Sequence, residues 1–239
     1  MRGVVRPVHI DIWSDVICPW CYLGKRRFDK ALSALAWAEQ IDVRWRAYQL
    51  DPHAPREPGD LSTAIERKYG PGAFDQMTAR LTSLGQAEGI AYRFDLAQRV
   101  NTLDAHRLLA WAWETGGPSG QERLQERIFQ AYFEAGENVA DPDALARFAG
   151  DAGLDAHDAK RVARSQAYAS EVADDLRRGL DRQLTGVPAF VIEDRWLIPG
   201  AQDVETMTAV LERARQQLVV VPSAQGVDDE ACAVDDPGC

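Results

Sequence analysis

The pattern of apolar and polar positions divides the chain into strand-like ends and a helix-rich middle. Residues 8–14, VHIDIWS, alternate in polarity and predict a β-strand. Phe28, Leu32 and Leu35 then follow the spacing of one helix face. Residues 41–50 alternate again and predict a second strand. The first part of the chain therefore has the order strand, helix, strand.

A loop at 51–60, with three prolines and a glycine, ends this first part. The middle of the chain is almost free of strand patterns and rich in helical ones. Helices are expected at 61–69, 73–88, 102–115, 120–135, 142–151 and 157–183. Several of the breaks between them contain glycine or proline, and Asp141 before Pro142 resembles an N-cap with proline at the first helical position.

Strand patterns return at 187–200, where two apolar runs flank Glu193-Asp194 and predict a hairpin. An amphipathic segment at 202–217 predicts a last helix. We find no internal repeat. The final residues are acidic and small, which indicates a tail. The order of elements is that of an α/β protein with a large helical segment between its two strand-containing parts.

Composition and charge limit the classes of function. The chain has 239 residues, 46% of them apolar, and a formal net charge of -10. A chain of this length buries a core without disulfides, and its negative charge disfavours nucleic acids and anionic membranes as main partners. No stretch approaches the roughly 20 apolar residues of a membrane span. No secretory signal precedes the first strand, so we expect a cytoplasmic protein.

Two of the four cysteines lie three positions apart, in Cys18-Pro19-Trp20-Cys21, where the first strand gives way to the first helix. Pro19 suits the first helical position, so Cys18 is expected at the helix N-terminus. Unpaired amides and the helix dipole there favour a thiolate, and we expect the pKa of Cys18 to fall from about 8.5 into the range of about 3.5–7.5. Cys21 lies one helical turn further along, behind the exposed Cys18 sulfur. The two sulfurs are expected to be close enough to form a disulfide.

Three interpretations of this pair compete. The cysteines are buried small apolar residues, half of a zinc site, or a redox-active dithiol. Thiols stay reduced in the cytoplasm, so a structural disulfide is disfavoured. Pro-Trp between the cysteines at a strand–helix junction favours redox chemistry.

A second motif, TGVPAF at 185–190, places Pro188 at the start of an apparent strand, where proline is unusual. The residue is either an ordinary trans proline at a sheet edge or a cis proline, and base rates favour trans. Together with SDVICPWCYLGK, NTLDAHRL (101–108) and the helical insertion, this motif resembles the DsbA-like branch of the thioredoxin superfamily. Within that branch the chain is most similar to FrnE-type proteins, which are related to 2-hydroxychromene-2-carboxylate isomerases and kappa-class glutathione transferases.

The resemblance covers about residues 8–217 and implies a thioredoxin fold interrupted by a large all-helical insertion domain. It also implies that Pro188 is cis and faces the cysteines, and that the backbone of Val187 is free to pair with a bound peptide. Pro19 and Trp20 are expected to line the same substrate surface. The implied divisions are 1–60 and 184–220 for the two parts of the thioredoxin fold, 61–183 for the helical domain and 221–239 for the tail.

Asn101 and His106 belong to the NTLDAHRL motif and have two interpretations. Either they line the site from the helical domain, or Asn101 or Thr102 caps a helix and His106 is a hydrogen-bonded histidine at a domain interface. The second interpretation is favoured.

The tail contains a second pair, Cys232 and Cys239, around an Asp-Pro-Gly turn. The tail pair is either a tethered relay that exchanges disulfides with the first pair, an incidental pair without a role, or half of a four-cysteine zinc site.

These patterns lead to the prediction of a thiol–disulfide oxidoreductase or isomerase. Cys18 attacks a substrate disulfide and Cys21 resolves the mixed disulfide. The relatives with isomerase or transferase activity carry serine at the position of Cys18, so two cysteines here favour exchange. The alternatives are a glutathione-dependent isomerase or transferase acting on a small aromatic molecule, and a metal-binding or redox-sensing module. Expected partners are protein or small-molecule disulfides and thiols, without a bound cofactor or metal, although glutathione is a candidate reductant or co-substrate. We expect a monomer or a homodimer.

Overall fold

A four-stranded sheet organises the computed structural model, which describes residues 7–219. The strand order is β2-β1-β5-β6, where β1 runs parallel to β2 and antiparallel to β5, and β5 pairs antiparallel with β6. The strands are β1 (Val8–Ser14), β2 (Ile41–Ala47), β5 (Ala189–Ile192) and β6 (Trp196–Pro199). The two ends of the sequence therefore complete one sheet, as expected for a thioredoxin fold.

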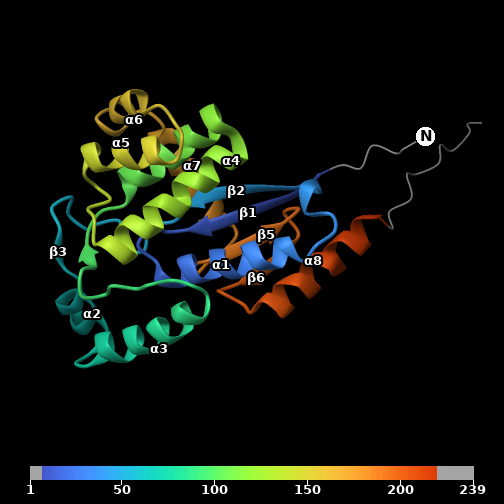
Figure 1. The fold of residues 1–239 in the computed structure, drawn as a ribbon, viewed down its shortest axis with the longest axis horizontal. Coiled ribbons are helices and arrows are strands. Elements are labelled where there is room, and N and C mark those ends of the chain that lie inside the picture. Colours follow the sequence, from blue (N-terminus) through green and yellow to red (C-terminus); the bar gives the residue numbers. More distant parts are fainter. Residues whose placement is uncertain (1–6, 220–239) are drawn as a thin grey trace, which may run out of the picture.

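Helices cover both faces of this sheet (Figure 1). Helices α1 (Pro19–Ser33) and α8 (Val204–Val219) lie on one face, and α4 (Leu103–Ala135) and α7 (Ala169–Asp181) lie on the other. Alternate residues of a strand point to opposite faces. Accordingly, Ile10 and Ile12 pack with Phe28 of α1, whereas Trp13 packs with Val191 on the α7 side.

The middle of the chain is helical, as predicted. Its other helices are α2 (Leu61–Tyr69), α3 (Ala73–Ala87), α5 (Pro142–Asp151) and α6 (Ala156–Ala163). Asp141 accepts hydrogen bonds from the first turn of α5 and confirms the expected N-cap. Three short elements were not predicted: the 3₁₀-helix η1 (Ala38–Gln40) and the antiparallel strands β3 (Gly59–Asp60) and β4 (Gln98–Arg99).

The prediction of a single helix at 157–183 is wrong. The segment forms α6 and α7, which are separated by residues 164–168, with Tyr168 in the left-handed region at a φ of 64°. Buried Arg107 of α4 fills this break, because its guanidinium donates to the carbonyl oxygens of Val162, Ala163 and Ala167. The free carbonyls at the end of α6 thus receive donors from another helix.

The expected break near residue 117 is present inside α4. Gly117 adopts a φ of 63° and a ψ of -165°, and Pro118 follows it. The predicted hairpin is also confirmed. Glu193 and Asp194, between β5 and β6, have φ values of 50° and 55°. Three residues, Glu193 to Arg195, join the paired residues Ile192 and Trp196, and the Arg195 N–H donates to the Ile192 carbonyl oxygen at 3.0 Å across a turn whose two central residues have positive φ.

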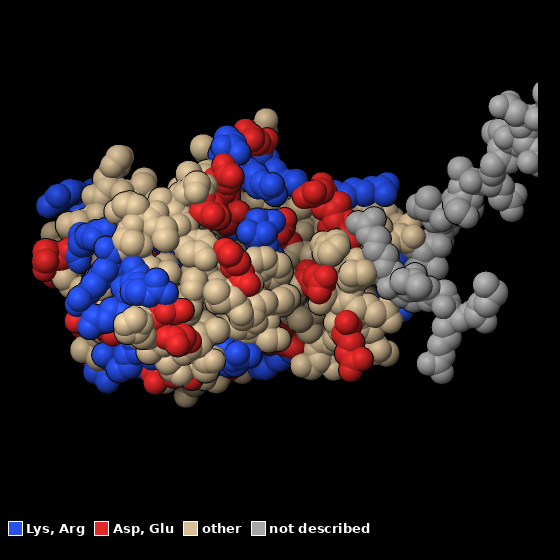
Figure 2. Space-filling model, turned by 90° about the horizontal axis from the view of Figure 1, so that it is seen from above, with Lys and Arg blue, Asp and Glu red and all other residues tan. Residues whose placement is uncertain are grey.

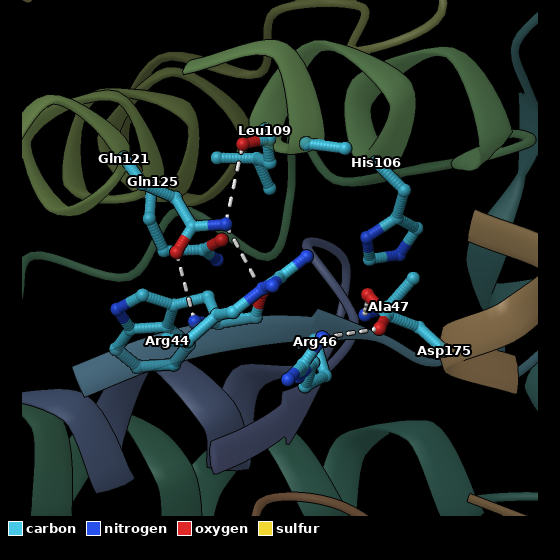
Figure 3. A pocket seen from close by; sticks show the side chains of 10 residues that line it. Arg44, Arg46, Ala47, His106, Leu109, Gln121, Gln125 and Asp175 are labelled. Carbon is cyan, nitrogen blue, oxygen red and sulfur yellow. Dashed lines mark hydrogen bonds and ion pairs between the residues drawn. The ribbon is translucent and has the colours of Figure 1, made fainter. Parts of the chain in front are cut away.

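The side chain of Gln121 fixes α4 against the neighbouring strand β2 (Figure 3). Its amide oxygen accepts from the Trp45 backbone N–H at 2.9 Å, and its amide nitrogen donates to the Trp45 and Leu109 carbonyl oxygens. The helical segment is therefore hydrogen-bonded to the sheet as well as packed on it.

Figure 2 shows acidic and basic side chains interspersed over the face seen there, with neutral residues between them. That face therefore lacks the continuous basic surface typical of nucleic-acid-binding proteins. Within residues 7–219, none of the helices combines the length and the apolar character required to cross a bilayer.

Helix α1 approaches the sheet most closely at Gly24. A Cβ atom on Gly24 would lie 2.9 Å from the ring Cγ of Pro188 and 3.5 Å from the ring of Phe190. The first distance is shorter than ordinary van der Waals contact, so a larger residue here would push α1 away from Pro188.

We expect Gly24→Ala to lower the free energy of unfolding by about 1–3 kcal/mol through overpacking, even though alanine favours helix by about 1 kcal/mol. The matched control is Gly59→Ala, since a Cβ on Gly59 would meet its neighbours at 3.7 Å or more. Chemical denaturation of both variants measures the effect. Equal stabilities for wild type and Gly24→Ala would show that α1 tolerates a greater distance from Pro188.

Candidate active site

The Cys-Pro-Trp-Cys segment forms the first turn of α1, as the sequence predicts. Cys18 is the N-cap residue and Pro19 occupies the first helical position. The Cys18 backbone N–H donates to the carbonyl oxygen of Asp15 at 3.0 Å, and the Cys18 carbonyl oxygen accepts from Cys21 N–H at 3.0 Å. Both cysteines are free thiols in this structure. The expected lowering of the Cys18 pKa stays a prediction.

The expectation of an exposed Cys18 sulfur is wrong. Cys18 is 3% exposed and Cys21 is fully buried. Both belong to the apolar core that Ile17, Trp20 and Val187 partly cover. The Cys18 thiol also donates to the Val187 carbonyl oxygen, with an S···O distance of 3.7 Å. The loop before β5 therefore closes over a sulfur that sequence reasoning places at the surface.

The Val187–Pro188 peptide bond is cis, which confirms what the family resemblance implies. Pro188 is buried and its carbonyl oxygen accepts from Gly200 N–H at 2.8 Å. Val187 is half-buried, and in the described part of the chain its N–H has no hydrogen-bond partner. One backbone donor next to Cys18 is thus free for an extended ligand.

The two residues between the cysteines are half-buried. Trp20 lies beneath the guanidinium of Arg80 from α3, at 5.5 Å from the ring centroid, in a cation–π contact. The carbonyl oxygen of Pro19 accepts a hydrogen bond from the Tyr92 hydroxyl at 2.6 Å. Tyr22, in contrast, is fully buried and stacks on Phe129 with a centroid distance of 5.0 Å, so it belongs to the core.

The environment of Cys21 opposes its ionisation. Burial raises the pKa of the Cys21 thiol well above its ordinary value, and the adjacent Cys18 raises it further. The nearby Ser14 side chain and Asp15 backbone lower this pKa in part. At neutral pH Cys21 is therefore a neutral thiol that needs help to become a nucleophile.

A buried contact between a carboxyl group and a histidine lies behind the motif. Asp15 is fully buried, accepts from the Leu50 N–H at 2.7 Å and lies 3.2 Å from Nε2 of His106. Thr102 is the N-cap residue of α4, and the side chain of Asn101 before it accepts from the Leu103 N–H at 2.9 Å. These contacts agree with the second interpretation, in which the motif begins a helix and His106 is a hydrogen-bonded interface residue. His106 also lines the cavity between β2 and α4 that Figure 3 shows.

Among the described residues, one group of three metal-ligand side chains lies close together, Asp155, His157 and Asp158. It is on the surface of α6, where Asp155 already caps the helix and Asp158 pairs with Arg161. Neither Cys18 nor Cys21 takes part in such a group within residues 7–219. The tail pair Cys232 and Cys239 lies outside the described residues.

Sequence reasoning missed Gly24, Asp15 and Tyr92. Gly24 and Asp15 stand within the stretch that resembles the family, SDVICPWCYLGK, so their position was a usable signal. Tyr92 carries no such signal, because its contact with Pro19 joins residues 73 positions apart.

A scan against family models matches residues 9–212 to the DSBA-like thioredoxin domain. A curated relative, the uncharacterised protein YwbO of Bacillus subtilis, is 26% identical over 196 residues, which cover 81% of this chain and 90% of that protein.

Solved structures agree with this match. The probable DsbA oxidoreductase SCO1869 of Streptomyces coelicolor is 34% identical, covers 97% of this chain and 100% of its own, and superposes with a TM-score of 0.82. The cytosolic disulfide reductase DsbM of Pseudomonas aeruginosa shares the fold at 17% identity, with a TM-score of 0.63 over 87% of this chain and 99% of its own. From the fold, the motif and these matches, the chain belongs to the family of DSBA-like thioredoxin domain proteins.

Proposed function

We propose that this protein is a thiol–disulfide oxidoreductase or isomerase of the FrnE type, with Cys18 and Cys21 as its redox-active pair. One arrangement carries the proposal. Cys18 stands at the N-cap of α1 with its sulfur against Val187 and the cis proline, and Cys21 lies one turn behind it. Membership in a DsbA-like thiol oxidoreductase family supports the same chemistry.

The reaction begins when the Cys18 thiolate attacks one sulfur of a substrate disulfide. A bond forms between Cys18 and that sulfur, and the other substrate sulfur leaves as a thiolate that takes up a proton. Cys21 then attacks the Cys18 sulfur, forms the Cys18–Cys21 disulfide and releases the second substrate thiol. The pair donates two electrons in total, and the reverse sequence oxidises a dithiol.

Docking of an extended substrate uses the loop before β5. The carbonyl oxygen of Val187 contacts the Cys18 sulfur, and the N–H of the same residue is unpaired among the described residues. An extended peptide adds to such a strand end through main-chain hydrogen bonds. Pro19 and Trp20 give this surface an apolar border beside Arg80. A substrate that pairs with Val187 displaces its carbonyl from Cys18 and exposes the sulfur.

The proposal also covers the substrates, the cofactor requirement, the location and the oligomeric state. The substrates are disulfides and thiols of proteins or small molecules, with glutathione as a candidate reductant, and the reaction requires no bound cofactor. The proposed location is the cytoplasm, where reduction or isomerisation is the favoured direction. A relay role for Cys232 and Cys239 and a monomeric or dimeric state stay predictions.

We expect Cys21→Ser to accumulate a mixed disulfide with a disulfide-bonded peptide, because no thiol of the pair remains to resolve it. Cys18→Ser should form no such adduct, since the buried Cys21 is the only thiol left in the motif. Mass spectrometry of the protein after mixing measures both results. The background for each variant is Cys232→Ser/Cys239→Ser, so that the tail thiols take no part.

The same variants distinguish exchange from glutathione chemistry on an aromatic substrate. Peptide disulfide turnover should fall at least about a hundredfold in Cys21→Ser, the effect expected when an essential nucleophile is lost. Unchanged turnover would contradict a two-cysteine mechanism.

The raised pKa of Cys21 also predicts how the stability of the reduced protein depends on pH. The unfolded thiol ionises near its ordinary pKa of about 8.5, while the folded thiol stays neutral, so the folded state binds more protons above that pH. Stability from this group is complete below about pH 8 and falls above it, by at most about 1.4 kcal/mol per pH unit.

Denaturation of the protein under reducing conditions, between about pH 8 and pH 9.5, measures this slope. Cys21→Ala removes the group and should give a flatter dependence on pH, whatever its effect on absolute stability. Parallel curves would contradict the raised pKa.

A further inference from the structure

Ser14 is the last residue of β1 and points toward α1. Residues two apart in a strand share a face, and Ile10 and Ile12 pack with Phe28 on the α1 side of the sheet. Ser14 continues this series and is 2% exposed. A hydroxyl group thus stands at the end of an otherwise apolar row.

Cys21 shares a face of α1 with residues that contact the sheet, and its own apolar neighbours belong to the core of the helical segment. It belongs to the row Cys21, Gly24 and Phe28, which follows the spacing of one helix face. Gly24 of this row approaches Pro188, and Phe28 contacts Phe190 with a ring centroid distance of 5.2 Å. Cys21 is the member of the row at the N-terminal end of α1, over the end of β1.

The Ser14 hydroxyl is a buried polar group without a satisfied hydrogen bond. Within the described residues its Oγ has no partner of normal hydrogen-bond geometry. Burying a hydroxyl without a partner costs about 1–3 kcal/mol, and native proteins rarely retain such groups without a reason. A neutral thiol is a weak acceptor, whereas a thiolate is a charged one that forms stronger hydrogen bonds.

The effects on the Cys21 pKa also indicate which groups can stabilise its charge. Burial and the neighbouring Cys18 raise the pKa of Cys21, and the groups that lower it are the Ser14 side chain and the Asp15 backbone. These adjacent residues end β1 and begin the turn to α1.

We propose that the Ser14 hydroxyl and the Asp15 N–H form a donor pair that stabilises the Cys21 thiolate during its attack on the Cys18 mixed disulfide. The inference rests on the proposed function. In this step the Cys21 thiol loses its proton, the Cys21–Cys18 bond forms, the bond from Cys18 to the substrate sulfur breaks, and the leaving thiolate takes up a proton. The donors have no such role in the first step, where Cys18 is the nucleophile.

A chromogenic aryl disulfide, dithiobisnitrobenzoate, separates the two steps. The reduced protein releases one equivalent of coloured thiolate when Cys18 attacks and a second when Cys21 displaces the aryl thiol from Cys18. Stopped-flow absorbance follows both phases in full-length protein. The Cys232→Ser/Cys239→Ser background removes the signal of the tail thiols.

We expect Ser14→Ala to leave the first phase unchanged and to slow the second by about tenfold, the effect of losing one hydrogen bond to a charged acceptor. The pH at which the second phase reaches half its maximal rate should rise. Ser14→Thr, which keeps the hydroxyl, should restore the second phase. The matched control is Ser33→Ala, because Ser33 lies at the far end of α1 and bonds only the Asp29 carbonyl oxygen.

The other possible outcomes would contradict either the role of Ser14 or the proposed function. A second phase in Ser14→Ala with the wild-type rate and pH profile would overturn the role of Ser14 and leave the exchange mechanism intact. Equal slowing of both phases would also overturn it, because the hydroxyl would then support the fold of the site as a whole. A second phase that persists in Cys21→Ser would overturn the proposed function itself.

Discussion

The contact between the first two turns of α1 and the ends of β1 and β5 is the constraint on which the candidate site depends. Gly24 permits it, since any larger residue would meet Pro188. One turn before this contact Cys21 is fully buried, and Cys18 lies beneath the Val187 carbonyl. Nucleophile, resolving thiol and docking loop thus owe their relative positions to one close approach of helix to sheet.

The helical middle of the chain is part of this site as well as a cover for the sheet. Cys18, Cys21 and Tyr22 share one apolar core with residues of α4 and α5, separate from the core between the sheet and α8. Tyr92 bonds the Pro19 carbonyl, and His106 pairs with Asp15 behind the motif. A rearrangement of the helical segment would therefore change the surroundings of both cysteines.

The elements that could be predicted from the sequence are those specified by local residues. Pro19 places the start of α1, alternation defines β1, and Glu193-Asp194 specifies the hairpin turn. The features that could not be predicted depend on distant partners. The break between α6 and α7 depends on Arg107, and the burial of Cys18 depends on a loop 169 residues away. Such contacts leave no trace in local periodicity.

Burial of both thiols gives each step of exchange a different physical requirement. Cys18 is 3% exposed and needs access. In the proposed mechanism, a substrate that pairs with Val187 supplies this access by replacing the carbonyl that now accepts from the sulfur. Cys21 needs no access, because its target is the neighbouring Cys18, but it must carry charge in an apolar interior. In the proposed second step, donors at the end of β1 meet that need. The proposal thus assigns the docking edge for Cys18 to the loop before β5, and the electrostatic support for Cys21 to the end of β1.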